Sequence, residues 1–278
     1  MLPQQYPAQV PLGFCLHLLG LFAEERGQDA AGLAVSDGSG TWTIGRTLGP
    51  FRRLARDQRH IRRVMSRAVI ALGHTRWATQ GGHGLAQASP LEAGPLLCTH
   101  NGDIDPATIP GVAVLPASDA ATDSHYLFGA IAAVHARRPV RAERLVSILS
   151  GVRGRAALAW TDTTRADRRV WLARGGLSPL AVGVDQHGGL WWASNPAWLR
   201  VMADQEHAGL QMVVTLLPEG SLWAVTPHRR HVSCRLIAEF KPTVRPRDEA
   251  IAAIAVWRGF NREDTAHDQT LLRHRTVA

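Results

Sequence analysis

The chain has few cysteines and no long apolar run. Its 278 residues include only Cys15, Cys98 and Cys234, a small, odd and widely spaced set that is atypical of a disulfide framework or a zinc knuckle. No apolar stretch approaches the roughly 18 residues that cross a bilayer. The first residues, "MLPQQYPAQVPLG", lack the basic and apolar regions of a secretory signal. We therefore expect a cytoplasmic protein without a membrane span.

Metal-binding patterns are also missing. The sequence has 13 histidines, but none falls in an HExxH or zinc-finger spacing. His228 and His231, in "TPHRRHVSC", lie close together without a further ligand nearby in sequence. We interpret both as surface residues of a turn. The sequence therefore predicts no metal site and no other cofactor.

The net charge is +8, which raises the question of a nucleic-acid partner. Much of the positive charge lies in "FRRLARDQRHIRRVMSR", residues 51–67, where apolar residues recur near helical spacing with arginines between them. This pattern favours one amphipathic helix with a solvated basic face over a phosphate-binding face. The other arginines are scattered, without the interleaved aromatics that single-strand binders use. We expect nucleic acid not to be a partner.

The order of expected elements favours an α+β fold in one main domain, residues 1–242. Helices are expected at about 14–25, 122–138 and 141–152, and "DGSG" is expected to turn a hairpin over 30–46. Strands come in antiparallel-looking groups, with helices clustered between them rather than alternating with them. Residues 243–278 turn polar and basic and are expected to form a partly helical or disordered extension. Expected strands include "AVIALGHTRW", "GPLLCTHNGDI", "RAALAWTD", "RRVWLAR", "LAVGVD", "LWWASN", "QMVVTLLP" and "SLWAVTP".

Seven segments occur in an order that resembles a known family. They are "ERGQDAAGLAV", "LGHTRWATQGG", "THNGDI", "ATDSHYL", "VRGRAALAWTD", "LARGGLSPLAVG" and "LWWASNPAWL". Together they resemble the class II glutamine amidotransferase domain, the glutaminase half of glucosamine-6-phosphate synthase and of glutamine phosphoribosylpyrophosphate amidotransferase. The resemblance covers residues 16 to 240, approximately. It implies the N-terminal-nucleophile hydrolase fold, a four-layer αββα sandwich in which two antiparallel sheets lie between helices.

The resemblance also implies a site for glutamine, which is a zwitterion. Arg76 matches the family's arginine for the α-carboxylate, and its planar guanidinium suits bidentate pairing. Asp123 matches the aspartate that holds the α-ammonium group, with Asp119 as an alternative. Trp77 and Thr79 match positions in the same substrate loop.

Two further groups of residues acquire roles from the resemblance. Asn101 and Gly102 match an oxyanion hole, an amide side chain and a backbone N–H directed at the charge of the tetrahedral intermediate. Arg26, Gly27 and Asp29 match a supporting motif that packs beneath the nucleophile.

The nucleophile is where the chain departs from the family. The resemblance implies a cysteine as the first residue of the mature chain, whose thiolate attacks the glutamine amide and releases ammonia. This sequence begins "MLPQQYPAQV". Cys15 precedes Arg26 by only 11 positions (26 minus 15) and lies among apolar residues, so we expect Cys15, Cys98 and Cys234 to be structural.

Three hypotheses follow. In the first, the chain is a glutaminase that starts upstream with a cysteine. In the second, it is an inactive module that binds glutamine. In the third, it keeps the fold and uses its basic helix to bind a nucleic acid or a partner protein. Only 36 residues (278 minus 242) follow Pro242, so we expect any ammonia-accepting enzyme to be a separate chain.

Overall fold

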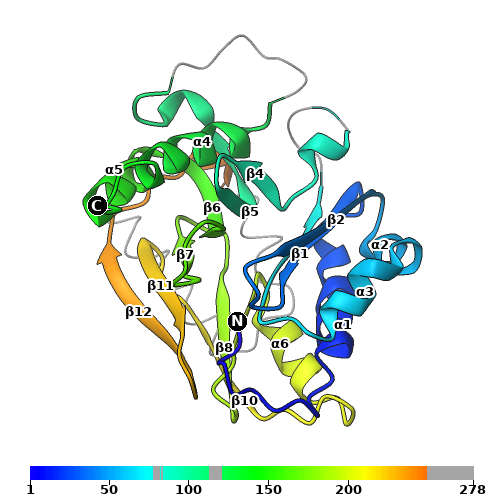
Figure 1. Ribbon diagram of the computed structural model, residues 1–278. Helices are drawn as coiled ribbons and strands as arrows, with labels where there is room; N and C mark the ends of the chain where they lie inside the picture. Colours follow the sequence, from blue (N-terminus) through cyan, green and yellow to red (C-terminus); the bar gives the residue numbers. More distant parts are fainter. Residues whose placement is uncertain (78–81, 83, 113–120, 249–278) are drawn as a thin grey trace.

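The protein is a layered α+β sandwich, described here from a computed structural model over residues 1–77, 82, 84–112 and 121–248. Two sheet layers lie face to face, and helices cover their outer sides (Figure 1). The paired strands are antiparallel, as expected from the clustering of helices and strands along the chain. The predicted α+β class is confirmed.

One sheet layer consists of two three-stranded sheets in the described part of the chain. The predicted hairpin forms its first two strands, with the "DGSG" turn between them, and the strand before "WATQGG" pairs along the other side of β1. These two sheets have the orders β2-β1-β3 and β10-β8-β9. Their strands are β1 (Ala30–Ser36), β2 (Trp42–Leu48), β3 (Ile70–Arg76), β8 (Ala181–Asp185), β9 (Leu190–Ala193) and β10 (Met212–Leu216).

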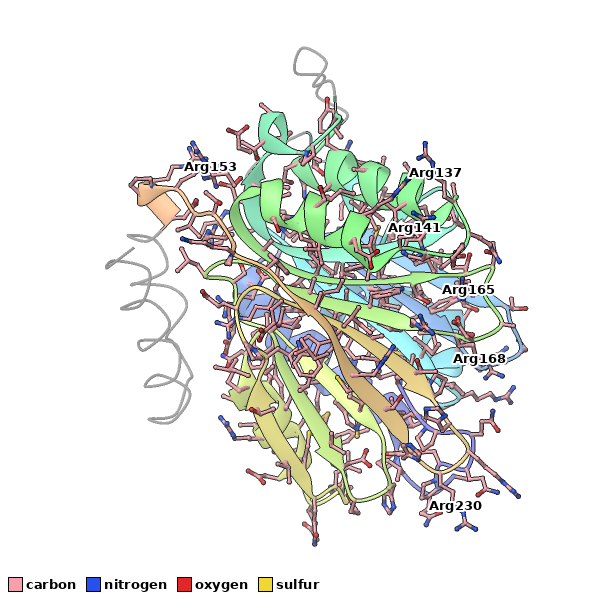
Figure 2. The ribbon with its side chains drawn as sticks, turned by 90° about the vertical axis from the view of Figure 1, so that its left-hand side faces the viewer. Arg137, Arg141, Arg153, Arg165, Arg168 and Arg230 are labelled. Atoms are coloured by element: carbon pink, nitrogen blue, oxygen red, sulfur yellow. The ribbon has the colours of Figure 1, made fainter. Side chains whose placement is uncertain are left out.

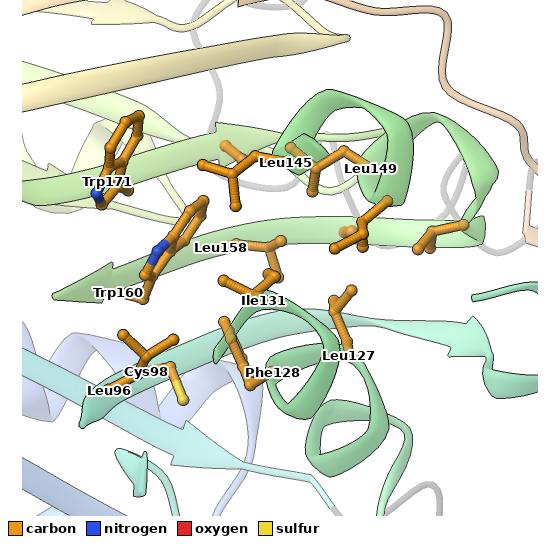
Figure 3. Packing of buried hydrophobic residues seen from close by; sticks show 14 of the residues in the cluster. Leu96, Cys98, Leu127, Phe128, Ile131, Leu145, Leu149, Leu158, Trp160 and Trp171 are labelled. Atoms are coloured by element: carbon orange, nitrogen blue, oxygen red, sulfur yellow. The ribbon is translucent and has the colours of Figure 1, made fainter. Parts of the chain in front are cut away.

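The other layer is a six-stranded sheet of order β12-β11-β7-β6-β5-β4. Its core lies against α4 and α5, where Trp160 is fully buried and stacks on Trp171 with ring centroids 6.0 Å apart (Figure 3). The strands are β4 (Leu91–Ala93), β5 (Leu96–Asp105), β6 (Arg153–Asp162), β7 (Val170–Arg174), β11 (Ser221–Pro227) and β12 (Val232–Glu239), and the helices are α4 (Asp123–His135) and α5 (Ala142–Gly151).

The basic segment forms two short helices, which corrects the expectation of one. They are α2 (Phe51–Asp57) and α3 (Arg59–Met65), and Gln58 between them has an extended-like backbone with φ −112° and ψ 79°. The Gln58 side chain donates a hydrogen bond to the Arg46 carbonyl, which fixes the break to β2. The apolar residues of both helices are buried as expected. Helix α1 (Leu12–Ala23) and α6 (Pro196–Ala203) complete this outer layer.

Some expectations fall at the edges of the described residues. Thr243 pairs with Arg153 beside β6, so the chain beyond Pro242 still contacts the domain. The helix expected within "PRDEAIAAIAVWRGF" lies outside the described residues from position 249 onward. The boundary at residue 242 therefore stays a prediction.

Arginines are spread over the described part of the chain. Figure 2 shows Arg137, Arg153, Arg165 and Arg230 in separate places, from one end of the view to the other. His228 and His231 are exposed at the turn between β11 and β12, and their rings stack with centroids 4.8 Å apart, as expected for turn residues. Within the described ranges, none of the helices is long and apolar enough to span a bilayer.

Candidate functional site

Arg76 is buried at the end of β3, between two acidic neighbours. It pairs with Ala30 of β1, its carbonyl accepts the Asp29 N–H at 2.9 Å, and its Nη1 donates to the Gly82 carbonyl at 2.9 Å. Burial lowers the pKa of the guanidinium, while the carboxylates of Asp29 and Asp123 raise it. The guanidinium is therefore partly desolvated, and the negative electrostatic potential of the two carboxylates favours its charged form.

Asp123 begins α4 and ties this helix to β5. Its Oδ2 accepts the buried Ile104 N–H at 3.0 Å, and its Oδ1 accepts the Ser124 N–H at 2.7 Å and the Ser124 hydroxyl at 3.2 Å. A carboxylate can accept about four hydrogen bonds, so these three hold its orientation and leave capacity for a ligand donor. The structure thus brings Asp123 within electrostatic reach of Arg76.

Asn101 and Gly102 lie within β5, and the strand continues to Asp105 rather than ending at them. This agrees with the strand expected over "GPLLCTHNGDI". Gly102 is opposite Ala156, and a Cβ at this glycine would clash with the Arg155 carbonyl oxygen, so the close approach requires glycine here. His74 connects β3 to this strand, because its Nε2 lies 2.8 Å from the His100 carbonyl oxygen.

Arg26 and Gly27 pack against the same end of β3. Gly27 ends a short 3₁₀ turn, and a Cβ there would clash with the Trp77 backbone nitrogen. Arg26 donates to the Ser194 carbonyl at 3.4 Å, and its guanidinium lies 5.9 Å from the Trp198 ring centroid. These contacts join β3, β9 and α6 beneath the site.

The substrate loop is only partly described. Trp77 is 72% exposed, so its ring is available to a ligand but contributes little to the core. Thr79 and Asp119 lie outside the described residues.

A cavity of about 170 Å³ lies between β3 and β9, and the residues that line it include Arg26 and Asn101 but not Arg76, Gly102 or Asp123. Its walls are largely apolar, and its polar lining comes from Arg26, His74, Thr75, Thr99, Asn101 and Ser194. Of these, sequence reasoning assigned roles only to Arg26 and Asn101. His74 and Thr75 lie next to Arg76 in "LGHTRWATQGG", and Ser194 lies in "LWWASNPAWL". Their positions inside these segments were the only sign in the sequence that they lie near the site.

The three cysteines lie in buried or half-buried surroundings that are typical of structural cysteines. Burial raises the pKa of the Cys15 and Cys234 thiols to about 11, and it raises the pKa of the Cys98 thiol further. Cys98 Sγ donates to the Leu91 carbonyl in the core, three residues before Asn101. None of these thiols has the lowered pKa of a nucleophilic cysteine.

No set of three His, Cys, Asp or Glu side chains within the described residues is arranged to hold a metal ion. The predictions about cofactors therefore stay predictions. Burial lowers the pKa of His74 to about 4; the hydrogen bond to the His100 carbonyl opposes this shift, and the charges of His100 and Arg76 add to it, so the imidazole at the site is neutral near pH 7.

The chain resembles known amidotransferases in part of its sequence. No protein-family model matches it. It is 32% identical over 107 residues to amidophosphoribosyltransferase of Drosophila melanogaster, which is 36% of this chain and 19% of that protein. It is 40% identical over 82 residues to glutamine–fructose-6-phosphate aminotransferase (isomerizing) of Aliivibrio fischeri, 30% of this chain and 13% of that protein. The matches thus span less than a fifth of these curated relatives.

Solved structures match most of the chain. The glutamine phosphoribosylpyrophosphate amidotransferase of B. subtilis, complexed with ADP and GMP, superposes with a TM-score of 0.55 at 20% identity, over 85% of this chain and 48% of that one. A structure described as the allosteric regulatory enzyme of purine biosynthesis gives 0.58 at 20% identity, over 87% and 49%. The resemblance to class II glutamine amidotransferases is thereby confirmed, and the fold is the four-layer αββα sandwich of the N-terminal-nucleophile hydrolases.

Proposed function

We propose that this chain binds glutamine where β3, β5 and α4 meet. Arg76 would pair with the α-carboxylate and Asp123 with the α-ammonium group. The observation that carries the proposal is that Arg76 at the end of β3 and Asp123 at the start of α4 are both buried and lie close enough for the Asp123 carboxylate to raise the Arg76 pKa. A cation and an anion held apart in this way match the two charges of a free amino acid.

The reaction that suits this arrangement is hydrolysis of the glutamine side-chain amide to glutamate and ammonia. Attack on the amide carbon moves charge onto its oxygen, where the Asn101 side chain and the Gly102 N–H would donate hydrogen bonds. Each such donor contributes a few kcal/mol, roughly, to lowering the barrier. The raised thiol pKa values of Cys15, Cys98 and Cys234 argue against any of them as the nucleophile.

We further propose that the ammonia passes to an acceptor on a separate protein in the cytoplasm. The support concerns the transfer itself and comes from the relatives, which are named as an amidophosphoribosyltransferase and a glutamine–fructose-6-phosphate aminotransferase. No membrane or nucleic-acid partner is part of this proposal.

Calorimetric titration with glutamine tests the binding step. We expect saturable binding to the unaltered chain and its loss in Arg76→Ala. The matched control is Arg137→Ala, because Arg137 is exposed just past the other end of α4 from Asp123. Equal affinity of Arg76→Ala and Arg137→Ala would refute the site. A parallel assay for released glutamate separates hydrolysis from binding alone.

A further inference from the structure

The segment that follows β12 packs beside the strand that carries Asn101 and Gly102. The Thr243 carbonyl accepts the Gly154 N–H at 2.9 Å, and Thr243 forms a parallel bridge with Arg153 at the start of β6. Figure 2 shows the last described residues close to Arg153. Since β6 pairs with β5 here, the segment reaches the part of β5 just after Gly102.

Arg245 connects this segment to the backbone of β5. Its Nη2 donates to the Asp103 carbonyl and to the Asp103 Oδ2, each at 2.7 Å. Its Nε and Nη2 also donate to the two carboxylate oxygens of Asp248, at 2.6 and 2.9 Å, and Asp248 is fully buried. The two bonds to Asp248 fix the plane of the guanidinium. The arginine is therefore held in one orientation, in which it reaches the backbone carbonyl of Asp103.

The peptide group between Asp103 and Ile104 is held at both ends by charged side chains. Its carbonyl accepts from Arg245, and its N–H donates to the Asp123 Oδ2 at 3.0 Å. Hydrogen bonds to charged groups are stronger than neutral ones, and a peptide polarised by a cation at its oxygen is a better donor to an anion at its N–H. This one peptide group thus connects Arg245 to the carboxylate of Asp123.

We propose that Arg245 is a positioning residue of the glutamine site. It would fix the peptide between Asp103 and Ile104, and this peptide would hold the Asp123 carboxylate toward the α-ammonium group. The inference rests on the proposed function, because glutamine is the ligand that Asp123 would hold. Arg245 itself would not touch the ligand.

Arg247 provides a matched control within the same segment. Its Nη2 donates to the Asp103 Oδ2 at 3.3 Å, so its hydrogen bond to Asp103 goes to the carboxylate rather than to the backbone carbonyl. Its side chain is 64% exposed, against 13% for Arg245. Replacing Arg247 therefore removes a positive charge near Asp103 without removing the contact with the peptide.

The amide signal of Ile104 tests this connection without any ligand. In a proton–nitrogen correlation spectrum, we expect Arg245→Ala to move the Ile104 amide proton upfield, because its hydrogen bond to Asp123 becomes weaker. Arg247→Ala should leave the signal close to its position in the unaltered chain. An Ile104 signal that moves as far in Arg247→Ala as in Arg245→Ala would overturn the proposal.

Calorimetric titration with glutamine tests the positioning role. We expect Arg245→Ala to bind glutamine about tenfold more weakly than the unaltered chain, the scale of one hydrogen bond to a charged group, and Arg247→Ala to bind within about threefold. When Asp123 is already asparagine, Arg245→Ala should change the affinity by less than about threefold, because its effect passes through that carboxylate. Equal losses with and without the Asp123 carboxylate would overturn the proposal, since a general loosening of the fold does not depend on Asp123.

Arg245→Lys carries the same test if Arg245→Ala does not fold. Lysine keeps a charged donor but lacks the planar guanidinium that spans Asp248 and the Asp103 carbonyl. We expect it to weaken glutamine binding by less than alanine does, and again only when the Asp123 carboxylate is present. Full binding by both Arg245 variants would overturn this inference and leave the proposed function intact. Absence of binding by the unaltered chain would refute the proposed function, and the Ile104 signal would still decide whether Arg245 acts on the peptide.

Discussion

Replacement of Asp123 by asparagine separates the structural from the binding role of this carboxylate. The carboxylate accepts three hydrogen bonds, from the Ile104 N–H and from the N–H and hydroxyl of Ser124. An amide has one acceptor oxygen, so its NH₂ group must face one set of these donors. A buried donor left unsatisfied costs about 1–3 kcal/mol. We expect thermal unfolding of Asp123→Asn several degrees below that of the unaltered chain, at about 2–4 °C per kcal/mol.

The effect on glutamine is expected to be larger than the effect on stability. Asp123→Asn keeps the shape but removes the negative charge proposed to face the α-ammonium group. Truncating one side of a buried charge pair costs about 2–5 kcal/mol, so affinity should fall by about 30-fold or more in calorimetry.

Ser124→Ala is the matched control for this experiment. It removes the hydroxyl contacts with Asp123 and with the His100 Nδ1, but it leaves the carboxylate and its bond to Ile104 in place. We expect it to bind glutamine within about threefold of the unaltered chain, less than 1 kcal/mol. An Asp123→Asn protein that is folded and binds glutamine as well as Ser124→Ala would refute the ammonium role.

Three further predictions concern stability. The pKa of His74 is lowered to about 4 in the folded protein, so as the pH drops the unfolded chain takes up a proton on this histidine before the folded protein does. The free energy of unfolding should therefore fall between pH 6.5 and pH 4. In urea titrations at several pH values, His74→Gln should show a smaller fall. Arg245→Ala should cost about 2–4 kcal/mol in the same assay, because the fully buried Asp248 loses its 2.6 Å ion pair. Trp160→Ala should cost about 3–5 kcal/mol. Trp77→Ala, at 72% exposure, should change stability by less than about 0.5 kcal/mol, and a similar cost for both tryptophans would contradict the burial argument.

Local sequence patterns predicted most of the helices and strands, because the alternation of apolar and polar residues along a segment reflects which of its side chains are buried. The "DGSG" turn between alternating segments gave the β1–β2 hairpin, and the apolar run before His74 gave β3. Strand β12 was missed because its residues are mostly half-buried or exposed, so they show little of the apolar periodicity that marks a strand. The break at Gln58 was also missed, since it depends on a contact with Arg46 across the fold.

The site was predictable to the extent that its residues sit inside quoted motifs. Arg76, Asn101 and Asp123 were chosen from "HTRW", "HNGD" and "TDS", and the structure brings their strands and helix together. Their individual roles depend on a ligand, so they stay proposals. Ser194 was missed although it lies inside the quoted segment "LWWASNPAWL", because only the fold shows that this segment lines the same cavity as Asn101.

The pairing of Met1 with Leu190 lay furthest beyond sequence reasoning. The start "MLPQQYPAQV" shows no alternation and no strand signal, yet Met1 pairs with Leu190, 189 positions away. Such a pairing has no local signature, because the partner of a strand edge is set by which other edge the fold leaves facing it.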